Sequence, residues 1–413
     1  MNDARSPVEA LPLLTADVPG IGGRIKRYDE DFLVEEIPLY EPGGEGTHVY
    51  FTIEKRGLTT LAAVRILALA LGRKPQEIGY AGMKDAHGVT RQRLSLEHID
   101  PRRVESLDLP RIRVLSISRH TNKLKLGHLA GNRFDIKIRE TAPNGECSAR
   151  RVMEVLARRG APNYFGPQRF GARGDNALVG RAVLLGRYDE AFSIMLGRPR
   201  PGEQADVRRA RSLFDEGNLA EAARAWPKGF GESARLCRAL LRCDGDARRA
   251  WRSVHHTLRK LYVSALQSDL FNRVLARRIG ELDRLCDGDV AWIHRNGSCF
   301  RVERAAVEQP RCDRFEISPS GPLFGKNMLE PDGQPADIER AVLAESGLTA
   351  DVFARADGGR LCGARRPLRV PVTDAGVESG TDERGPYVRL TFRLPPGAYA
   401  TSVVREVCRP VSP

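Results

Sequence analysis

Residues 80–95 read YAGMKDAHGVTRQRLS, a polar loop that joins two segments typical of β-strands, IGYAG at 78–82 and VTRQRLSLEH at 89–98. The loop carries one carboxylate, Asp85, directly after Lys84 and between two glycines. A carboxylate at such a connection is placed like a reacting group, because functional residues concentrate in loops on a rigid scaffold. The alternative is an ordinary turn, since Asp caps backbone N–H groups and Gly accepts positive φ. The loop alone leaves both interpretations open.

The chain as a whole is strongly basic. It has 413 residues, with 66 Lys and Arg against 53 Asp and Glu, a net charge of +13. A basic surface favours a polyanionic partner such as nucleic acid, because neutralising phosphates supplies affinity without sequence readout. The alternative is an arginine-rich surface that reflects only a GC-rich genome, because arginine is used far more than lysine. Charge alone does not decide between them.

Neither a membrane anchor nor a metal centre is expected. The longest apolar stretch, 61–71, is interrupted by Arg65 and is too short to span a bilayer, and the first ten residues lack a signal-peptide core. The eight cysteines form no CxxC pair and no zinc spacing with histidine. We interpret them as reduced thiols of a cytoplasmic protein that needs no metal and no cofactor.

The first part of the chain has the pattern of an α+β unit. Residues 1–20 look like a loose tail. Strand-like segments follow at 23–37, 47–57, 111–120 and 132–140, besides the two that flank Asp85. A helix is expected at 61–72 after an N-cap at Thr59 or Thr60, and another at 147–160 with Ser148 as a plausible cap.

The middle of the chain has a different pattern. Residues 176–280 are almost entirely helical in periodicity, and 287–303 indicate a hairpin around Asn296 and Gly297. The end of the chain returns to a strand, a Pro/Gly turn and a helix. We therefore predict one α+β domain with a mixed or antiparallel sheet, built from residues 21–172 and 365–413 and interrupted by a mainly helical insertion at 173–364.

Five stretches, in this order, resemble the TruD family of tRNA pseudouridine synthases. They are EDFLVEEIPLYEPGGEGTHVYFTIEKRG (30–57), AGMKDAHGVTRQRLS (81–95), LGHLAGNRFDIKIRE (126–140), APNYFGPQRFG (161–171) and LPPGAYATSVVREV (394–407). The resemblance implies a pseudouridine synthase catalytic domain interrupted by an inserted TRUD domain. It also implies isomerisation of uridine to pseudouridine in tRNA, most often at uridine 13 of the D-arm, with Asp85 as the catalytic residue.

The implied chemistry needs one carboxylate and no cofactor. The C1′–N1 bond of the uridine breaks, the uracil turns, and a C1′–C5 bond forms. An ionised aspartate can attack C1′ as a nucleophile or remove the C2′ proton as a base. The sequence does not choose between the two.

Three further residues are expected to bind the substrate. The resemblance implies that Phe134 stacks on the flipped uracil, although an aromatic residue on a strand is more often part of the core. Asn132 could hydrogen-bond the uracil edge, or it could be a turn residue at the strand entry. The resemblance also implies a basic partner for the aspartate near the first strand, where Lys26 is preferred and the neighbouring Arg27 is the alternative, since strand alternation turns only one of them inward.

Four residues are expected to contact RNA: Lys84, Arg91, Gln168 and Arg169. The partner is then tRNA, with no membrane and no obligatory protein partner. Two other classes compete with this interpretation. One is a non-catalytic RNA-binding protein that keeps the fold, which the intact Asp85 motif disfavours. The other is a glycosidase, which needs a second carboxylate, for which Asp135 and Glu97 are weak candidates.

Overall fold

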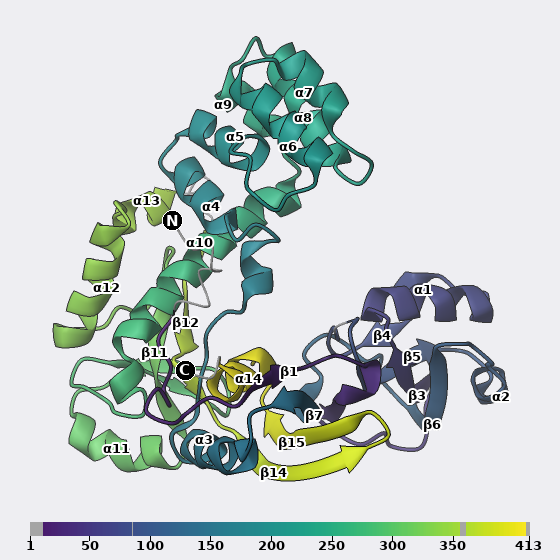
Figure 1. Ribbon diagram of the computed structural model, residues 1–413. Helices are drawn as coiled ribbons and strands as arrows, with labels where there is room; N and C mark the ends of the chain where they lie inside the picture. The colour runs from purple at the N-terminus through teal and green to yellow at the C-terminus, as the bar shows by residue number, and fades with distance from the viewer. Residues whose placement is uncertain (1–10, 85, 356–360, 410–413) are drawn as a thin grey trace. The chain divides into compact units, whose positions relative to one another are not determined.

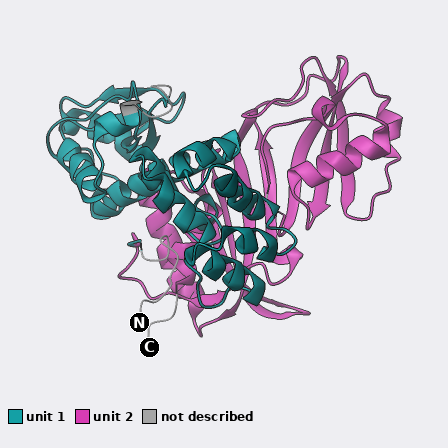
Figure 2. Cartoon of the chain, turned by 90° about the horizontal axis from the view of Figure 1, so that it is seen from above, with its two compact units in different colours: residues 1–12, 164–368 teal, residues 13–163, 369–413 magenta. Residues whose placement is uncertain are grey.

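The computed structural model describes residues 11–84, 86–355 and 361–409. The chain divides into two compact units (Figures 1 and 2). Unit 2 contains residues 13–163 and 369–413, and unit 1 contains residues 1–12 and 164–368. Unit 2 is therefore built from two distant parts of the sequence. No helix in the described part of the chain has the length and apolar character needed to cross a membrane.

The centre of unit 2, as far as it is described, is a nine-stranded sheet. Seven strands follow the order β14-β15-β7-β2-β5-β3-β6, while β1 pairs with β7 and β4 with β5. The strands are β1 (Gly22–Arg24), β2 (Phe32–Pro38), β3 (His48–Arg56), β4 (Gly79–Tyr80), β5 (Val89–Glu97), β6 (Ile112–His120), β7 (Leu129–Thr141), β14 (Thr373–Asp382) and β15 (Gly385–Leu394). The β2–β5 pair is parallel and its neighbours are antiparallel, so the sheet is mixed. The predicted α+β fold class is confirmed.

Helix α1 (Thr60–Leu71) covers the β3–β5 end of this sheet. Its ends follow local sequence rules, because the Thr59 side chain accepts a hydrogen bond from the N–H of Ala62 and Gly72 closes the helix in the left-handed region. Its apolar side packs on β3 and β5 in a cluster that includes Phe51, Ile53 and Leu94. The predicted helix and its N-cap at Thr59 are confirmed.

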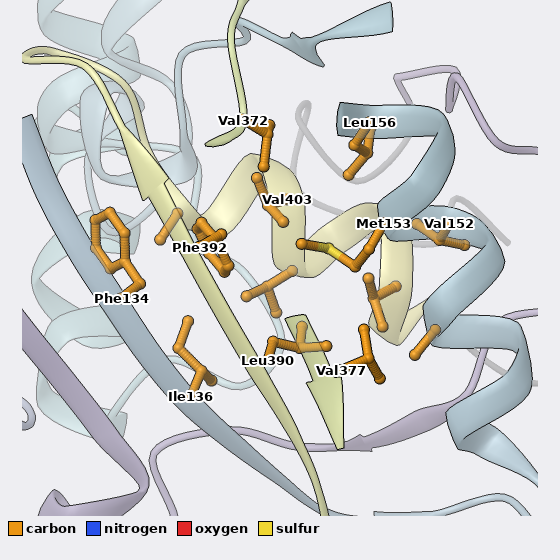
Figure 3. Packing of buried hydrophobic residues seen from close by; sticks show 14 of the residues in the cluster. Phe134, Ile136, Val152, Met153, Leu156, Val372, Val377, Leu390, Phe392 and Val403 are labelled. Atoms are coloured by element: carbon orange, nitrogen blue, oxygen red, sulfur yellow. The ribbon is translucent and has the colours of Figure 1, made fainter. Parts of the chain in front are cut away.

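Helices α3 (Gly145–Arg159) and α14 (Ala400–Cys408) provide the second apolar cluster of unit 2 (Figure 3). Ile136 of β7 and Leu390 of β15 are register partners and both are fully buried. Val403 of α14 and Met153 of α3 lie in the same cluster. Burying such side chains contributes about 1.5–3 kcal/mol each, which holds the C-terminal strand and helix to the N-terminal part of the unit.

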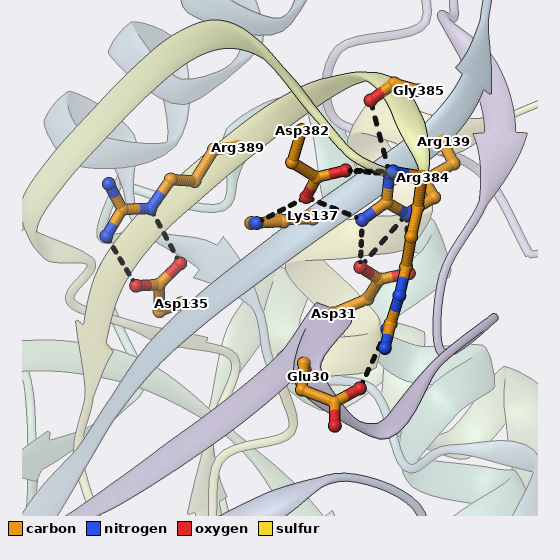
Figure 4. A network of polar contacts seen from close by, with 9 residues as sticks. All are labelled: Glu30, Asp31, Asp135, Lys137, Arg139, Asp382, Arg384, Gly385 and Arg389. Carbon is orange, nitrogen blue, oxygen red and sulfur yellow. Dashed lines mark hydrogen bonds and ion pairs between the residues drawn. The ribbon is translucent and has the colours of Figure 1, made fainter.

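The opposite face of the sheet carries ion pairs (Figure 4). Arg139 of β7 donates to both carboxylate oxygens of Asp31 and to Asp382, at 2.7 to 3.0 Å. Arg389 of β15 forms a two-pronged pair with Asp135. This face and the apolar face alternate along each strand, as expected when only one face is covered by helices.

Three local expectations for unit 2 are corrected. Residues 13–20 are not a loose tail, because Thr15 is buried and both its N–H and its hydroxyl donate to Glu406. The first strand region is split into β1 and β2 by a 3₁₀ turn at Asp29–Asp31. Ser148 lies inside α3, whose N-cap position is held by Asn144 in a left-handed conformation.

Unit 1 combines helices with a smaller sheet. Its helices are α4 (Asn176–Leu184), α5 (Tyr188–Leu196), α6 (Ala205–Asp215), α7 (Leu219–Ala225), α8 (Gly231–Arg242), α9 (Ala247–Ala250), α10 (His256–Arg277), α11 (Ala305–Asp313), α12 (Gly333–Glu345) and α13 (Ala350–Arg355). Its strands are β9 (Val290–Ile293), β10 (Cys299–Arg301), β11 (Ile317–Leu323) and β12 (Ala364–Pro367), which form a sheet in the order β10-β9-β11-β12. The β9–β10 hairpin is predicted correctly, but β11 and β12 are missed. Strand β11 contains two prolines and a glycine, which are uncommon in strands, and β12 has only four residues, two of them arginine.

The unit boundaries differ from the predicted ones at 172 and 365. Residues 164–172 belong to unit 1, because the N–H of Phe165 donates to the side chain of Asn272 in α10 and the Asn272 amide donates back to the carbonyl of Phe165. At the other junction, Arg369 and Val370 form the short strand β13, which pairs with β8 (Ala161–Pro162) of unit 2 from residue 369 onward. These contacts between residues far apart in the sequence decide where the chain passes from one unit to the other. The local composition of the sequence does not reveal them.

Candidate active site

A polar strip lies in the middle of the helix-covered face of the unit 2 sheet. Val34 of β2 is in register with Phe134 of β7 and with Thr90 of β5, so these three side chains share one face. The α3–α14 cluster covers this face over β7 and β15, and the α1 cluster covers it over β3 and β5. Glu36, two residues beyond Val34, lies between the two clusters. Around Glu36 this face of the sheet carries hydrogen-bonding side chains instead of apolar ones.

The residue that precedes Asp85 is fixed by this strip. The Lys84 ammonium donates to Glu36 Oε2 at 2.8 Å, and the two side chains are 5% and 3% exposed. The backbone N–H of Lys84 donates to the Thr60 hydroxyl at 2.8 Å, and that hydroxyl donates to the side-chain carbonyl of Gln92 at 2.9 Å. Lys84 is therefore held both by β2 and by the start of α1.

Three polar atoms of this strip are buried without a hydrogen-bond partner among the described residues. They are Thr90 Oγ1, Gln92 Nε2 and Asn132 Oδ1. Asn132 is the register partner of Glu36, so it lies beside the Glu36–Lys84 pair. Buried polar atoms are nearly always paired, and an orphan at a polar site is typical of a group that binds a ligand or an ordered water.

Phe134 lies at the edge of the strip and is 6% exposed. Its ring stacks on Phe392 with centroids 5.2 Å apart and meets the edge of Phe32 at 6.4 Å. Within the protein, Phe134 therefore has the contacts of a core side chain. Its position two residues from Asn132 on the same strand face also places it next to the orphan amide oxygen.

Lys26 and Arg27 are separated, although not by strand alternation. Strand β1 ends at Arg24, and Lys26 adopts a left-handed conformation with φ of 56°. Its ammonium lies 4.2 Å from the centre of the Phe32 ring, whereas Arg27 pairs with the Glu140 carboxylate. Lys26 therefore reaches the aromatic pair Phe32–Phe134, and Arg27 points to a different partner.

Asp85 lies outside the described residues. The loop that contains it returns to the sheet at Gly88, with φ of 133°, where an added Cβ would lie 2.4 Å from the Phe32 carbonyl oxygen. Only glycine tolerates both this conformation and this approach. The loop is therefore bound on one side by Lys84 and on the other by a glycine packed against Phe32.

Arg91 does not join this strip. It is in register with Glu35 and Glu54, so its side chain lies on the opposite face of the sheet from Thr90. Its guanidinium donates to Glu54 at 3.0 Å. Burial raises the pKa of Glu54, but hydrogen bonds from Arg91 and Arg56 outweigh burial and lower it overall. Of the expected residues of unit 2 that the structure describes, Lys84, Asn132, Phe134 and Lys26 lie on or beside the strip.

Gln168 and Arg169 belong to unit 1, in a 3₁₀ turn over Pro167–Phe170. Gln168 is exposed. Arg169 donates to the hydroxyls of Ser264 and Ser268 on α10, and it lies 5.6 Å from the Phe165 ring centre. These contacts fix the Arg169 side chain along α10.

The sequence interpretation missed Glu36, Thr60 and Gln92. Glu36 and Gln92 occur within the quoted motifs, but a lone glutamate or glutamine on a strand gives no sign that it faces a buried lysine or a helix start. No group of three or more His, Cys, Asp or Glu within the described ranges could hold a metal ion.

Comparison with known proteins decides the family. The family described as tRNA pseudouridine synthase D (TruD) matches residues 10–407, nearly the whole chain. The chain belongs to the TruD family. It is therefore an enzyme of the pseudouridine synthase class, as the sequence motifs predict.

Relatives across this TruD family are similar over their full length. The chain is 49% identical to the tRNA pseudouridine synthase D of Geobacter sulfurreducens, with 96% of each chain covered. It is 39% identical to that of Anaeromyxobacter sp., again over 96% of each. The crystal structure of the putative tRNA pseudouridine synthase D (TruD) from Methanosarcina mazei superposes with a TM-score of 0.88 at 28% identity, covering 98% of both chains.

Proposed function

We propose that this TruD-family enzyme converts uridine 13 in the D-arm of tRNA to pseudouridine, with Asp85 as the reacting carboxylate. Membership of the family supports the reaction and the tRNA substrate. The observation that carries the proposal is the polar strip on the sheet of unit 2. It anchors the residue before Asp85, and beside this anchor the Asn132 amide oxygen is buried with no partner in the described ranges.

The strip suits an uncharged base held out of its stack. Uracil presents one N–H donor between two carbonyl acceptors on its pairing edge. Asn132 Oδ1 is an acceptor with no partner among the described residues, so it can accept from the uracil N3–H. A wrong ligand leaves a buried polar group of the site without a hydrogen bond. The free-energy cost of that unpaired group gives strong selection for the right ligand.

Asp85 supplies the chemical step in either of two ways. As a nucleophile its carboxylate attacks C1′ while the C1′–N1 bond breaks, and the freed uracil turns and forms the C1′–C5 bond as the carboxylate leaves. As a base it removes the C2′ proton while the C1′–N1 bond breaks, and the glycal-like intermediate takes the proton back when C5 of the turned uracil adds to C1′. In both routes C5 loses its proton and N1 gains one, so the reaction is an isomerisation without a cofactor.

Phe134 and Lys26 are proposed to hold the base and the carboxylate. Phe134 would replace part of the stacking that the uracil loses when it leaves the helix, worth roughly 1–3 kcal/mol. Because the ring is 6% exposed, the base must reach its uncovered edge or displace Phe32. Lys26 already lies over Phe32 and would place a positive charge next to the reacting group.

Lys84 and Arg91 take different roles from those expected. The Lys84 ammonium is buried and paired with Glu36, so we propose that it positions the loop rather than contacting phosphate. Arg91 lies on the opposite face of the sheet and is proposed to stabilise Glu54. Gln168 and Arg169 remain candidates for RNA contact in unit 1.

Mapping of pseudouridine tests the proposal. Wild-type protein and Asp85→Asn are incubated separately with an unmodified tRNA transcript that carries uridine 13, and pseudouridine is located by carbodiimide labelling and primer extension. A single new stop at position 13 with wild type alone is expected. Turnover by Asp85→Asn, or tight RNA binding by wild type without any stop, would contradict the assignment.

A further inference from the structure

The start of α10 is part of a stretch with no acidic residue. Residues 247–268 contain no Asp or Glu but five Lys or Arg: Arg248, Arg249, Arg252, Arg259 and Lys260. The stretch also contains His255 and His256. In a chain that is 29% charged with both signs mixed elsewhere, a run of 22 residues with one sign only is a local departure. It marks a positive segment within unit 1.

Within this segment, one face of α10 forms part of the lining of a groove. His256, Arg259, Lys260, Ser264 and Gln267 follow the spacing of residues that lie above one another on a helix, and all line a groove of about 1260 Å³, which we call the α10 groove. The opposite wall is largely apolar and includes Leu184 and Leu185. Positive charge thus gathers along one wall of a concave surface, rather than on a convex helix face.

The two cations in the α10 groove have no partner within the described residues, whereas neighbouring arginines of unit 1 do. The side chains of Arg259 and Lys260 are exposed and form neither an ion pair nor a hydrogen bond in the described part of the chain. By contrast, Arg181 donates to the carbonyl of Ser346, and Arg211 donates to the carbonyls of Met195 and Gly197. Because no described acid pairs with Arg259 or Lys260, their charge is available for an external anion.

The α10 groove is continuous with the 3₁₀ turn that carries Gln168 and Arg169. Ser264 lines the groove and also accepts a hydrogen bond from Arg169. From His256 to Ser264 the helix rises about 12 Å, which is about two phosphate-to-phosphate steps along a nucleic acid strand. A strand that follows α10 can therefore contact the basic end of the groove and the turn at Arg169 together.

We propose that the α10 groove of unit 1 binds the phosphodiester backbone of tRNA, as a surface separate from the polar strip of unit 2. This inference rests on the proposed function and gives unit 1 a defined RNA-binding surface. Arginine and lysine without acidic neighbours match phosphate oxygens, and backbone contacts give affinity without base readout. A concave wall suits a rod-like polyanion better than a flat bilayer. An acidic protein segment is the competing occupant that the test addresses.

The test compares two double variants that remove the same charge. Arg259→Gln/Lys260→Gln removes two unpaired cations from the α10 groove. The control, Arg314→Gln/Arg340→Gln, removes two exposed arginines of unit 1 that pair with Glu316 and Asp337. Binding of the unmodified tRNA transcript is measured at several salt concentrations. The slope of log affinity against log salt should fall in magnitude by about 2 for the groove variant, because each lost phosphate contact removes about one released counterion.

The kinetics give a second readout. The groove variant should raise KM for tRNA, with the loss carried by KM rather than kcat, because a backbone contact that does not involve the reacting atoms is the same in ground and transition state. A groove variant whose slope and KM match those of the control would overturn the inference. So would weaker binding of a poly-glutamate peptide with unchanged tRNA binding. If wild type makes no pseudouridine but the slope still falls, the proposed function fails while the binding surface stands.

Discussion

The Lys84 ammonium lies 2.8 Å from the Glu36 carboxylate, with both side chains almost fully buried. The pair joins the residue before Asp85 to strand β2, which runs parallel to β5. A second hydrogen bond, from the Lys84 N–H to Thr60, joins it to α1. The reacting loop is thus tied to two elements by the residue that immediately precedes the expected catalytic aspartate.

Glu36→Gln should destabilise unit 2 by about 3–5 kcal/mol, because it leaves the Lys84 ammonium buried without a counter-charge. The three tryptophans, Trp226, Trp251 and Trp292, all lie in unit 1. Stability is therefore measured by hydrogen exchange of peptides from β7. The double variant Glu36→Gln/Lys84→Met should recover much of the loss. Equal stability of wild type and Glu36→Gln would show that the pair does not hold the loop.

Thr60→Val should lower kcat because it disturbs the position of the loop that contains Asp85, although Thr60 takes no part in the reaction itself. The change keeps the shape of the side chain but removes the acceptor for the Lys84 N–H and the donor to Gln92, which costs about 1–3 kcal/mol for the groups left unpaired. Thr60→Ser retains the hydroxyl and should restore kcat. The readout is single-turnover pseudouridine formation with saturating enzyme. A rate for Thr60→Val equal to that of Thr60→Ser would remove Thr60 from the positioning role.

Phe134→Leu should reduce the rate of isomerisation by about 5- to 150-fold, the equivalent of the roughly 1–3 kcal/mol of base stacking. The matched control is Phe392→Leu, which removes the other ring of the stacked pair within the same core. Both changes should cost less stability than the roughly 3–5 kcal/mol of a Phe→Ala truncation. Equal rates for the two variants, measured at matched folded fractions, would assign Phe134 to the core alone.

Asp382→Asn should flatten the acid side of the stability profile. Hydrogen bonds from Arg139 and Lys137 hold the pKa of Asp382 below its ordinary range. A depressed folded-state pKa contributes stability above the unfolded value of about 3.9, and this contribution is lost as pH falls through the folded-state pKa. Urea midpoints of unit 2 from pH 2 to pH 7, followed by far-UV circular dichroism, should therefore fall less below pH 4 in the variant. The exposed Asp108→Asn serves as control and should follow wild type.

Elements whose signals are local are predicted correctly. Helix α1, its Thr59 cap and its closing Gly72 follow from residues within a few positions of each other. The turn at Asn296 and Gly297 does so as well. Ser148 is not the N-cap because α3 begins earlier, at Gly145. The N-cap position is held by Asn144, which has a left-handed conformation and makes no capping hydrogen bond with its side chain.

The site residues divide in the same way. The family resemblance singles out Lys84, Asn132, Phe134 and Lys26, which the structure places on or beside one strip. It also singles out Arg91, which the register of β5 turns to the opposite face. A one-residue step along a strand changes the face, and the sequence does not fix which strand lies beside which.

The sequence by itself determined the family, the interrupted α+β organisation and the loop that contains Asp85, because motifs, periodicity and turn residues act over short distances. Only the tertiary structure decided that Glu36 neutralises Lys84, that the Asn132 amide oxygen is buried without a partner among the described residues, and that Thr15 is anchored by Glu406. Each of these depends on pairing between segments far apart in the chain. Burial makes each pairing important for stability, because burying a charge or polar group away from water costs free energy unless the group has a partner.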